Sequence, residues 1–383
     1  MYQGKKISVA MATYNGERFI REQLESILDQ SVPPDEVVVS DDGSSDRTVV
    51  IVMELAKAQT LKEKGVSIRI LTDNPRHGHC GNFDWASRHT TGDYIFFCDQ
   101  DDVWEPDKIE AVADCFLRRP DAKAVFHDST LIDAAGQPID YPYNEDLADL
   151  TDATHMGGDD YKLLRSRYGK LAVSNTIARG MTLCVTKELL TKSLPFPGKY
   201  HDHWLGCTAV LFDGMYYLDR KLTRYRLHED QSCGLKFYRK KTLLKKLRSL
   251  SNRNRLHITA GLPLLSFGRA ALRLFESLKL SPGDAKEAAL GISAYGSELT
   301  DIFNNKGRLS GVLSLREFCK HSSRYRGMGR GMIRGDFVAM LLVSRKKRRR
   351  LIRQCAESYP YLDDYRVSAP LKKAVFEGKK REN

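Results

Sequence analysis

Two short apolar runs that each end in carboxylates most constrain how this chain can fold. Residues 37–44 read VVVSDDGS, and residues 93–102 read DYIFFCDQDD. Apolar runs of this length predict strands that are buried on both faces. Because ligands of open parallel sheets bind beyond the carboxyl ends of the strands, we expect both acidic clusters at one edge, facing one ligand.

Strand and helix patterns alternate between residues 5 and 135, which predicts an α/β fold with a parallel, doubly wound sheet. Beyond this region the pattern becomes loop-like over residues 134–158 and mainly helical after residue 235. Ser44 or Ser45 is the expected N-cap of the second helix. Strands are expected over residues 7–11, 36–40, 66–71, 94–98 and 124–128, and helices over 17–30, 46–64, 81–89 and 107–118.

Composition and cysteine usage place the chain among cytoplasmic globular proteins. The sequence has 383 residues, 42% of them hydrophobic, and its longest uncharged apolar stretch, residues 258–268, is far shorter than the roughly 18 residues of a membrane span. The N-terminus leads into a strand pattern and shows no secretory signal. The eight cysteines form no C-x-x-C pair, and Cys98 and Cys184 lie in apolar surroundings. We therefore expect reduced, mostly buried cysteines.

The net charge of +12 is unevenly distributed along the chain. Residues 231–275 contain eleven Lys or Arg and no Asp or Glu, and residues 345–350 read RKKRRR. Such patches suit phosphate-rich surfaces, either nucleic acid or anionic lipid. The alternative is a solvated helical face with no dedicated partner.

The cluster of Asp99, Asp101 and Asp102 is the sharpest single signal. Three carboxylates repel one another unless a cation neutralises them. Hard oxygen ligands favour Mg²⁺ or Mn²⁺, and Mg²⁺ usually also binds substrate phosphates. The cluster therefore predicts a site for a metal-bound diphosphate; the alternative is an acidic loop that caps the helix after Pro106.

Two further segments follow predicted strands at the same edge. The loop 12–16, ATYNG, places backbone N–H groups beside the ligand, although it is not a G-x-G-x-x-G fingerprint and an Asn-Gly turn can be purely steric. Asp41 can accept hydrogen bonds from a base N–H or a ribose hydroxyl. The alternative for Asp41 is a glycine turn with an N-capping serine.

Two later segments carry acid–base and cationic side chains. Residues 200–204, YHDHW, place Asp202 as a general base with a locally tuned pKa, or as an acid at a helix start with Trp204 in the core. A zinc site is also conceivable, but His201 and His203 lack the i, i+4 spacing of a helical pair. In residues 224–232, RYRLHEDQS, Arg224 and Arg226 suit a diphosphate, unless this is a charged surface strand.

Together these motifs resemble the family 2 glycosyltransferases of the GT-A fold over about residues 5–235. The segments 8–16, 22–31 and 38–46 look like the opening strand and nucleotide loop, the first helix and the base-binding strand end of that family. Residues 97–104, FCDQDDVW, match the D-x-D form of its rhamnosyltransferase-like branch, as do residues 126–136. The chain departs from the family at residues 180–184, GMTLC, and at 228–231, HEDQ, where members have H-x-x-N.

The resemblance implies a mostly parallel GT-A sheet flanked by helices. This glycosyltransferase domain would span residues 1–235, with a nucleotide-sugar half over 1–135 and an acceptor half over 136–235, and a basic helical extension would span 236–383. The implied roles are nucleotide contacts for Thr13, Tyr14 and Glu17, base binding for Asp41, ribose or diphosphate binding for Asp99, Mg²⁺ or Mn²⁺ binding for Asp101 and His228, and base catalysis for Asp202.

The implied activity is that of an inverting, metal-dependent glycosyltransferase in the synthesis of a cell-surface polysaccharide. The donor would be a nucleotide-diphosphate sugar, with dTDP-rhamnose favoured by the branch, and the acceptor a glycan on a lipid carrier. Residues 236–255, from Lys236 to Arg255, would hold the enzyme at the inner face of an anionic membrane.

Two alternatives come from other functional classes. A metal-dependent nucleotidyltransferase would also need acidic strand ends, but the loop 12–16 lacks the lysine of its usual phosphate loop. A nucleic-acid-binding protein is suggested by charge alone. Because the basic patches lack a recognised module and interleaved aromatics, no nucleic-acid partner is expected.

Overall fold

The structure is a computed structural model that describes residues 1–58, 63–140, 161–164, 178–198, 200–231, 261–277, 284–306, 310–311, 313–315 and 344–357. The chain divides into two compact units. The first comprises Met1–Ala172, Thr176–Phe196 and Tyr200–Lys240, and the second comprises Val173–Asn175, Pro197–Lys199 and Lys241–Asn383. The domain boundary predicted at residue 235 lies outside the described residues.

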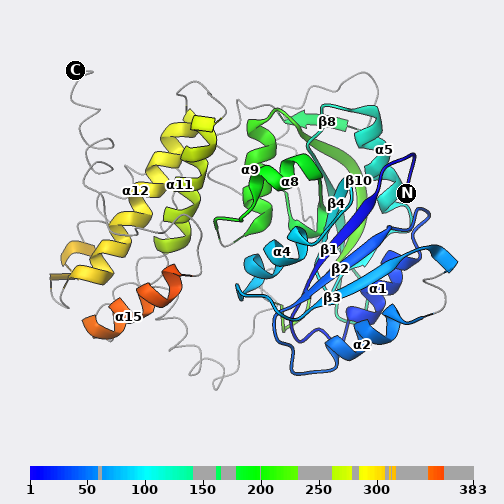
Figure 1. The fold of residues 1–383 in the computed structure, drawn as a ribbon, viewed down its shortest axis with the longest axis horizontal. Helices are drawn as coiled ribbons and strands as arrows, with labels where there is room; N and C mark the ends of the chain where they lie inside the picture. Colours follow the sequence, from blue (N-terminus) through cyan, green and yellow to red (C-terminus); the bar gives the residue numbers. More distant parts are fainter. Residues whose placement is uncertain are drawn as a thin grey trace. The chain divides into compact units, whose positions relative to one another are not determined.

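The first unit is built on one sheet with the strand order β3-β2-β1-β4-β9-β6-β10-β5 (Figure 1). Its parallel half confirms the strands predicted near the N-terminus. In that half, the carboxyl ends of β1 and β2 lie side by side, since Thr13 pairs with Asp41. The strands are β1 (Ile7–Thr13), β2 (Glu36–Asp41), β3 (Ser67–Leu71), β4 (Tyr94–Cys98), β5 (Val103–Trp104), β6 (Ala124–Ile132), β7 (Pro138–Ile139), β8 (Tyr161–Leu164), β9 (Leu183–Thr186) and β10 (Met215–Arg226).

The other half of the sheet is mixed, which the local sequence pattern did not predict. β9 is antiparallel to both β4 and β6, whereas β6 and β10 are parallel to each other. β5, β7 and β8 add antiparallel pairs to β10 and β6. The α/β class is confirmed, and the parallel half still brings the ends of β1, β2 and β4 to one edge.

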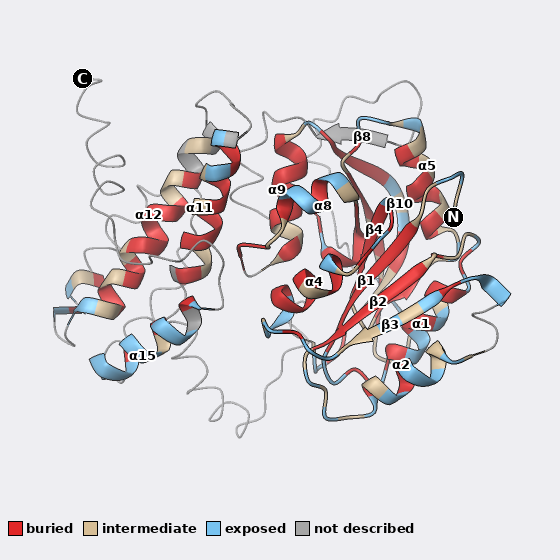
Figure 2. Cartoon of the chain, in the orientation of Figure 1, coloured by how far each residue is buried: buried red, intermediate tan, exposed pale blue. Residues whose placement is uncertain are grey.

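Helices cover both faces of this sheet (Figures 1 and 2). On one face, α1 (Ile20–Leu28), α2 (Thr48–Ala56) and α5 (Lys108–Arg118) share a buried core with alternate strand residues such as Val9 and Phe96. On the other face lie α4 (His79–Arg88), α8 (Lys187–Ser193) and α9 (His201–Leu211). There, Phe97 contacts Phe83 of α4 and His201 of α9. Because successive side chains of a strand point to opposite faces of the sheet, β4 contributes residues to the cores on both faces.

The first two helices are shorter than predicted, because residues predicted to form the first turn of each helix belong instead to the loop that follows the preceding strand. α1 begins at Ile20, after a turn in which Phe19 N–H donates to Gly16. α2 begins at Thr48, so Ser44 and Ser45 are not its N-cap; the Ser44 hydroxyl instead bonds Asp41. α2 ends at Ala56, and residues 59–62 of the predicted longer helix lie outside the described part.

The second unit contains α11 (Gly261–Ser277), α12 (Asp284–Asn305) and α15 (Arg345–Ala356), which confirms a helical C-terminal region. α11 and α12 approach closely: a Cβ on Gly268 would lie 2.7 Å from Ser293. The buried guanidinium of Arg348 donates to the carbonyls of Phe303 and Lys306 at 2.9 and 2.5 Å, which satisfies backbone acceptors at the end of α12. Within the described residues, none of the helices has the length and apolar character required to cross a bilayer.

Five cysteines, Cys80, Cys98, Cys115, Cys184 and Cys207, are free and buried, as predicted. Cys98 and Cys184 lie on the neighbouring strands β4 and β9, and burial raises the pKa of each thiol well above its usual value. These thiols therefore pack as small apolar side chains.

Candidate functional site

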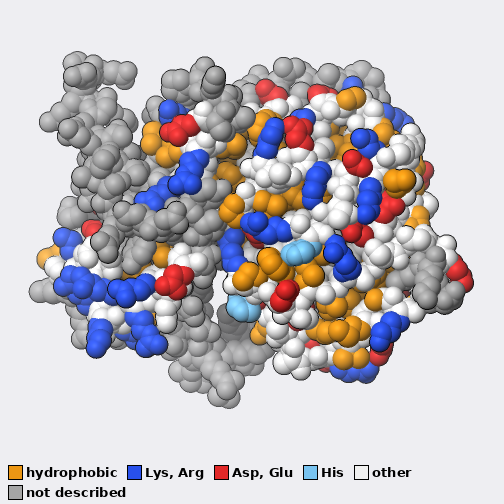
Figure 3. Space-filling view, in the orientation of Figure 1, with side chains coloured by type: hydrophobic (Ala, Val, Ile, Leu, Met, Phe, Trp, Pro, Cys, Tyr) orange, Lys and Arg blue, Asp and Glu red, His pale blue; other side chains and the backbone are white. Residues whose placement is uncertain are grey.

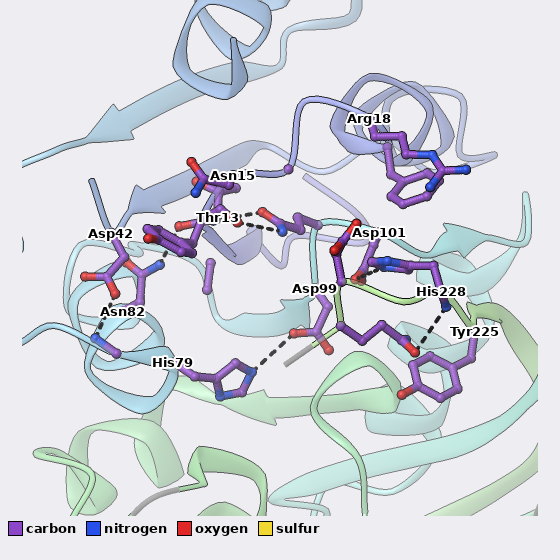
Figure 4. Close-up of a pocket in the computed structure, with 18 residues that line it drawn as sticks. Thr13, Asn15, Arg18, Asp42, His79, Asn82, Asp99, Asp101, Tyr225 and His228 are labelled. Carbon is purple, nitrogen blue, oxygen red and sulfur yellow. Dashed lines mark hydrogen bonds and ion pairs between the residues drawn. The ribbon is translucent and has the colours of Figure 1, made fainter. Parts of the chain in front are cut away.

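A cavity of about 660 Å³ opens at the carboxyl ends of β1, β2 and β4 (Figure 4). The prediction that the two acidic strand ends lie at one edge of the sheet is confirmed, because Asp42 from one and Asp99 and Asp101 from the other line this cavity. The remaining lining residues come from the end of β1 and the loop after it, from the start of α4, from the segment after β4, and from the end of β10 and the residues after it. They are Ala12, Thr13, Tyr14, Asn15, Gly16, Arg18, Phe19, Gly78, His79, Asn82, Gln100, Tyr225, His228, Asp230 and Gln231.

The loop after β1 is fixed to the end of β4 by one amide side chain. Gln100 accepts a hydrogen bond from Tyr14 N–H at 2.8 Å and donates to the Tyr14 carbonyl at 3.1 Å. A side chain at position 16 would displace Gln100, because a Cβ there would lie 2.3 Å from Gln100 Oε1. Thr13 and Tyr14, predicted to contact a nucleotide, both line the cavity, and the Tyr14 side chain is exposed.

Asp41 organises the turn after β2 and does not line the cavity. It is 2% exposed and accepts hydrogen bonds from the hydroxyls of Thr13 and Ser44 and from the N–H groups of Gly43 and Ser44. Its neighbour Asp42 lines the cavity and lies 2.6 Å from His77 Nδ1. Asp42, and not Asp41, is therefore the acid of this turn that lines the cavity.

Glu17 also lies outside the cavity lining. Its carboxylate accepts a hydrogen bond from Arg47 N–H at 2.9 Å, and its own N–H donates to Asp46 at 3.0 Å. These bonds join the start of α1 to the start of α2. The nucleotide contact predicted for Glu17 therefore stays a prediction, while the adjacent Arg18 lines the cavity.

The acids after β4 differ in their surroundings. Asp101 Oδ2 lies 2.9 Å from His228 Nε2, and both side chains line the cavity. Asp102 is fully buried and accepts a hydrogen bond from Arg226 N–H. Burial raises the pKa of both carboxyls, and neighbouring acids add to the effect; the hydrogen bond from His228 opposes it at Asp101.

The Asp101–His228 pair fits a small divalent cation. Asp101 offers a carboxylate oxygen, the ligand type that Mg²⁺ and Mn²⁺ prefer, and the imidazole nitrogen of His228 lies 2.9 Å from it. Among the residues that the structure describes, no three His, Cys, Asp or Glu side chains form a group that could hold a metal ion. Two protein ligands suffice where water and substrate phosphates complete the shell, as is usual for Mg²⁺.

The two arginines predicted to stabilise a diphosphate are placed outside the cavity lining. Arg226 is 1% exposed; it donates to the Asp101 carbonyl at 2.9 Å and to Glu22 at 2.7 Å, and it stacks on Phe19. Arg224 pairs with Glu105 at 3.2 Å. Arg226 therefore supports the acidic end of β4 through bonds made outside the cavity. Among the described lining residues, the one Arg or Lys is Arg18.

Asp202 lies in the first turn of α9, and it is bonded by Gly180, which belongs to the segment 180–184 where the chain departs from the expected family pattern. The Gly180 N–H donates to its Oδ2 at 3.2 Å, and the His203 N–H donates to its Oδ1 at 2.7 Å. Burial raises the pKa of Asp202 to about 6, although these amides and the charge of His79 lower it. A carboxylate tuned in this way suits a general base near neutral pH.

The neighbouring His201 belongs to the core on this face of the sheet. Its ring lies 3.9 Å from the Phe83 ring centroid and 4.9 Å from that of Phe97, and it is 1% exposed. Burial lowers the pKa of this imidazole well below its usual value. His201 and His203 do not belong to a three-residue metal group in the described part of the chain, so the alternative of a zinc site gains no support.

Several lining residues carried no recognisable signal in the sequence. Gln100 stands between the acids of the predicted motif, yet only the structure reveals its double bond to Tyr14. Asn82 donates to the Thr13 carbonyl at 3.0 Å from within a predicted helix. His79 and Tyr225 come from segments far apart in sequence. Among these, only Arg18, two residues after the loop 12–16, could have been found from its position.

Comparisons with known proteins identify relatives of this chain. The family model described as "Glycosyl transferase family 2" matches residues 8–144. The dTDP-rhamnosyl transferase RfbG of Shigella flexneri is 31% identical over 239 residues, which cover 58% of this chain and 73% of that protein. An uncharacterized glycosyltransferase of Nostoc sp. is 30% identical over 38% of this chain, and the match spans only 45% of that protein's length.

A solved structure supports the same fold assignment. The crystal structure of S. aureus TarS 1-349 in complex with UDP-GlcNAc is 14% identical to this chain, with a TM-score of 0.52 and coverage of 93% of each chain. At this identity the likeness concerns the fold alone. It confirms the predicted GT-A fold, and the family match over residues 8–144 confirms the resemblance to family 2 glycosyltransferases that was drawn over about residues 5–235.

Proposed function

This chain belongs to glycosyltransferase family 2, and we propose that it transfers a sugar from a nucleotide-diphosphate donor to a glycan acceptor with inversion at the anomeric carbon. The observation that carries this proposal is the Asp101–His228 pair beside Asp99, inside a cavity of about 660 Å³. That volume suits a nucleotide-sized ligand. The donor would lie along the loop after β1, with its diphosphate toward Asp101.

Within this proposal, dTDP-rhamnose is the favoured donor and a lipid-linked glycan the favoured acceptor. The relative RfbG is named a dTDP-rhamnosyl transferase, and its match extends over 239 residues, well beyond the nucleotide-binding half. Thr13, Tyr14 and the Asp42 side of the turn would contact the nucleotide. Asp41 would act by holding that turn, since its four hydrogen bonds come from within the protein.

Asp101 and His228 would hold a Mg²⁺ or Mn²⁺ ion. When bound, such an ion neutralises charge that develops on a diphosphate leaving group. Arg18 also lines the cavity and would add a positive charge there. Arg226 would keep Asp101 in position through its bond to the Asp101 carbonyl.

Asp202 would accept the proton of the acceptor hydroxyl. The hydroxyl oxygen then forms a bond to the anomeric carbon from the face opposite the diphosphate. The bond from that carbon to the diphosphate oxygen breaks, and its electron pair leaves with the nucleoside diphosphate. The raised pKa of Asp202, about 6, gives a stronger base than an ordinary aspartate, while the carboxylate remains ionised at pH 7.

A cationic surface would bring the enzyme to a lipid-linked acceptor at an anionic membrane. The segment predicted to form this surface, Lys236 to Arg255, lies outside the described residues; α15 carries the second basic run of the sequence and would add to the surface. Figure 3 shows Lys and Arg side chains gathered over α15, and exposed cations occupy Arg345, Lys346, Lys347, Arg349, Arg350 and Arg353. Each contributes about 1 kcal/mol near an anionic surface.

The stereochemistry of the product tests the chemistry. Incubation with dTDP-rhamnose, Mn²⁺ and a polyprenyl-diphosphate-linked glycan should release dTDP, and proton NMR of the product should show an inverted anomeric centre. A product with retained configuration would exclude the direct displacement assisted by Asp202.

A further inference from the structure

Lys108 is a buried lysine that takes no part in the transfer steps proposed above. It is the first residue of α5 and is 1% exposed. Its Nζ donates to the Met181 carbonyl at 2.8 Å and to the Thr223 hydroxyl at 2.9 Å, and it lies 3.8 Å from the centre of the Trp104 ring. None of these three partners is a carboxylate. Because burying an amine without an ion pair costs stability, these hydrogen bonds call for a functional explanation.

The Met181 carbonyl belongs to a short turn that also contacts the proposed base. This turn, the 3₁₀ helix Gly180–Thr182, leads into β9, and each of its residues is buried. At its first residue, the Gly180 N–H donates to Asp202 Oδ2 at 3.2 Å. The turn lies directly against α9, because a Cβ on Gly180 would come within 2.7 Å of His201 Nε2. The turn is therefore held by α9 at its first residue and by the buried amine at its second.

The Thr223 hydroxyl completes this contact from β10. It is fully buried, accepts the hydrogen bond from Lys108 and donates to the Met181 carbonyl at 3.3 Å. The two acceptor sites of that carbonyl are therefore both filled by buried side chains. Lys108 begins α5 on one face of the sheet, whereas the turn contacts α9 on the other face. Lys108 thus joins a helix on one face to the turn that bonds Asp202 on the other.

We propose that Lys108 is a positioning residue: by fixing the turn through its carbonyl, it holds the Gly180 N–H against Asp202 and so keeps this carboxylate in place for the acceptor hydroxyl. The catalytic consequence rests on the base role proposed above for Asp202. The contacts that hold the turn do not depend on that role.

This role does not depend on the charge of Lys108. Burial lowers the pKa of its amine to about 7, although neighbouring acidic groups such as Asp102 oppose this shift. The ammonium has three N–H groups and the neutral amine has two, and two acceptors are to be satisfied. Both forms can therefore make the same two hydrogen bonds, and the proposed role is one of geometry.

The first test needs no substrate. Lys108→Met keeps the length and the apolar part of the side chain and removes both hydrogen bonds. In the full chain, hydrogen exchange read by mass spectrometry should become about tenfold faster at the amides of residues 180–182, because the turn loses its bonded carbonyl. Lys187→Met is the matched control: Lys187 is also the first residue of a helix, α8, and donates to a backbone carbonyl, that of Thr90. It should leave these amides unchanged.

A second variant covers the case in which Lys108→Met does not fold. Thr223→Val keeps the shape of its side chain and removes only the hydroxyl, so the exchange of the same amides should rise in the same direction by a smaller factor. Unchanged exchange at residues 180–182 in whichever of the two variants folds would overturn the proposal.

The closing test uses dTDP-rhamnose and the lipid-linked glycan of the stereochemical test. Lys108→Met should lower kcat by about tenfold or more, with the donor KM changed by less than about twofold. In an Asp202→Asn background the same substitution should change kcat by less than about twofold, because the base through which it acts is gone. A merely structural loss would lower kcat by the same factor in both backgrounds, and that result would overturn the positioning role. If no transfer is found at all, the exchange experiment still decides whether Lys108 holds the turn, and only the proposed reaction fails.

Discussion

Single residues at the ends of β2 and β4 have distinct tasks that their spacing does not reveal. The sequence pattern correctly predicted that acids from both strand ends line one cavity, because parallel strands end at one edge. It did not predict that Asp42 rather than Asp41 faces the cavity, since the direction of a side chain in a turn depends on its hydrogen bonds. The structural role of Arg226 was not predicted for a similar reason: the groups to which it donates, on Asp101 and Glu22, are remote from it in the sequence.

The proposed base at Asp202 predicts a specific loss. Asp202→Asn keeps the shape of the side chain but cannot accept the proton, so turnover should fall by about 10²–10⁴ while donor affinity is unchanged. In the wild type, turnover should rise with pH through about 6, because the ionised carboxylate is the active form. The variant should lack that limb. Near-normal turnover in Asp202→Asn would show that another group takes the proton.

The proposed metal ligand at Asp101 predicts a loss of a different kind. Asp101→Ala should abolish the increase in donor affinity that Mn²⁺ produces, because only His228 would remain of the pair. Titration calorimetry with dTDP-rhamnose, with and without Mn²⁺, measures this directly. Asp29→Ala, at an exposed position after α1, is the control. The metal role is wrong if Asp101→Ala and the wild type respond equally to Mn²⁺.

At the scale of elements, local pattern predicted the parallel half of the sheet but not the mixed half. The strand β4 was predicted with its observed bounds, because its buried run stops at an acid. β9 and β10 were not predicted as neighbours of β4 and β6, since those pairings join residues separated by 57 to 94 positions in the sequence. Long-range pairing of this kind leaves no periodic signal in the sequence.

The contact between Gly16 and Gln100 predicts a rescue. Gly16→Ala should displace the Gln100 side chain, cost about 1–3 kcal/mol of unfolding free energy and weaken donor binding, since the loop after β1 loses both Gln100 bonds. Adding Gln100→Ala should restore part of the stability by removing the clash. Urea unfolding measures both effects.

Gly291, a helical glycine with free space around it, is the control for the substitution at Gly16. A Cβ on Gly291 of α12 would meet no atom within 4 Å, so Gly291→Ala should leave stability equal or raise it by up to about 1 kcal/mol. Strictly additive losses for Gly16→Ala and Gln100→Ala would contradict the steric account.

At the scale of the whole molecule, the net charge of +12 predicts that the enzyme works at an anionic membrane surface. Neutralising Arg345, Lys346 and Lys347 to Gln should weaken binding to anionic phosphatidylglycerol vesicles by up to about 100-fold, at about 1 kcal/mol per charge. Co-sedimentation with vesicles measures this. The control neutralises Lys57, Lys64 and Lys192 of the first unit, which removes the same net charge. Vesicle binding that does not change with salt concentration or with the fraction of anionic lipid would contradict the proposed membrane surface.

The central claim is that this cavity binds a nucleotide-diphosphate sugar with a divalent metal. A panel of nucleotide sugars, scored by thermal shift with and without Mn²⁺, tests it most directly. We predict a rise in Tm with one diphosphate sugar, dTDP-rhamnose first among them, that requires Mn²⁺ and disappears in Asp101→Ala. The absence of any metal-dependent shift across the panel would contradict the assignment of this site to a sugar donor.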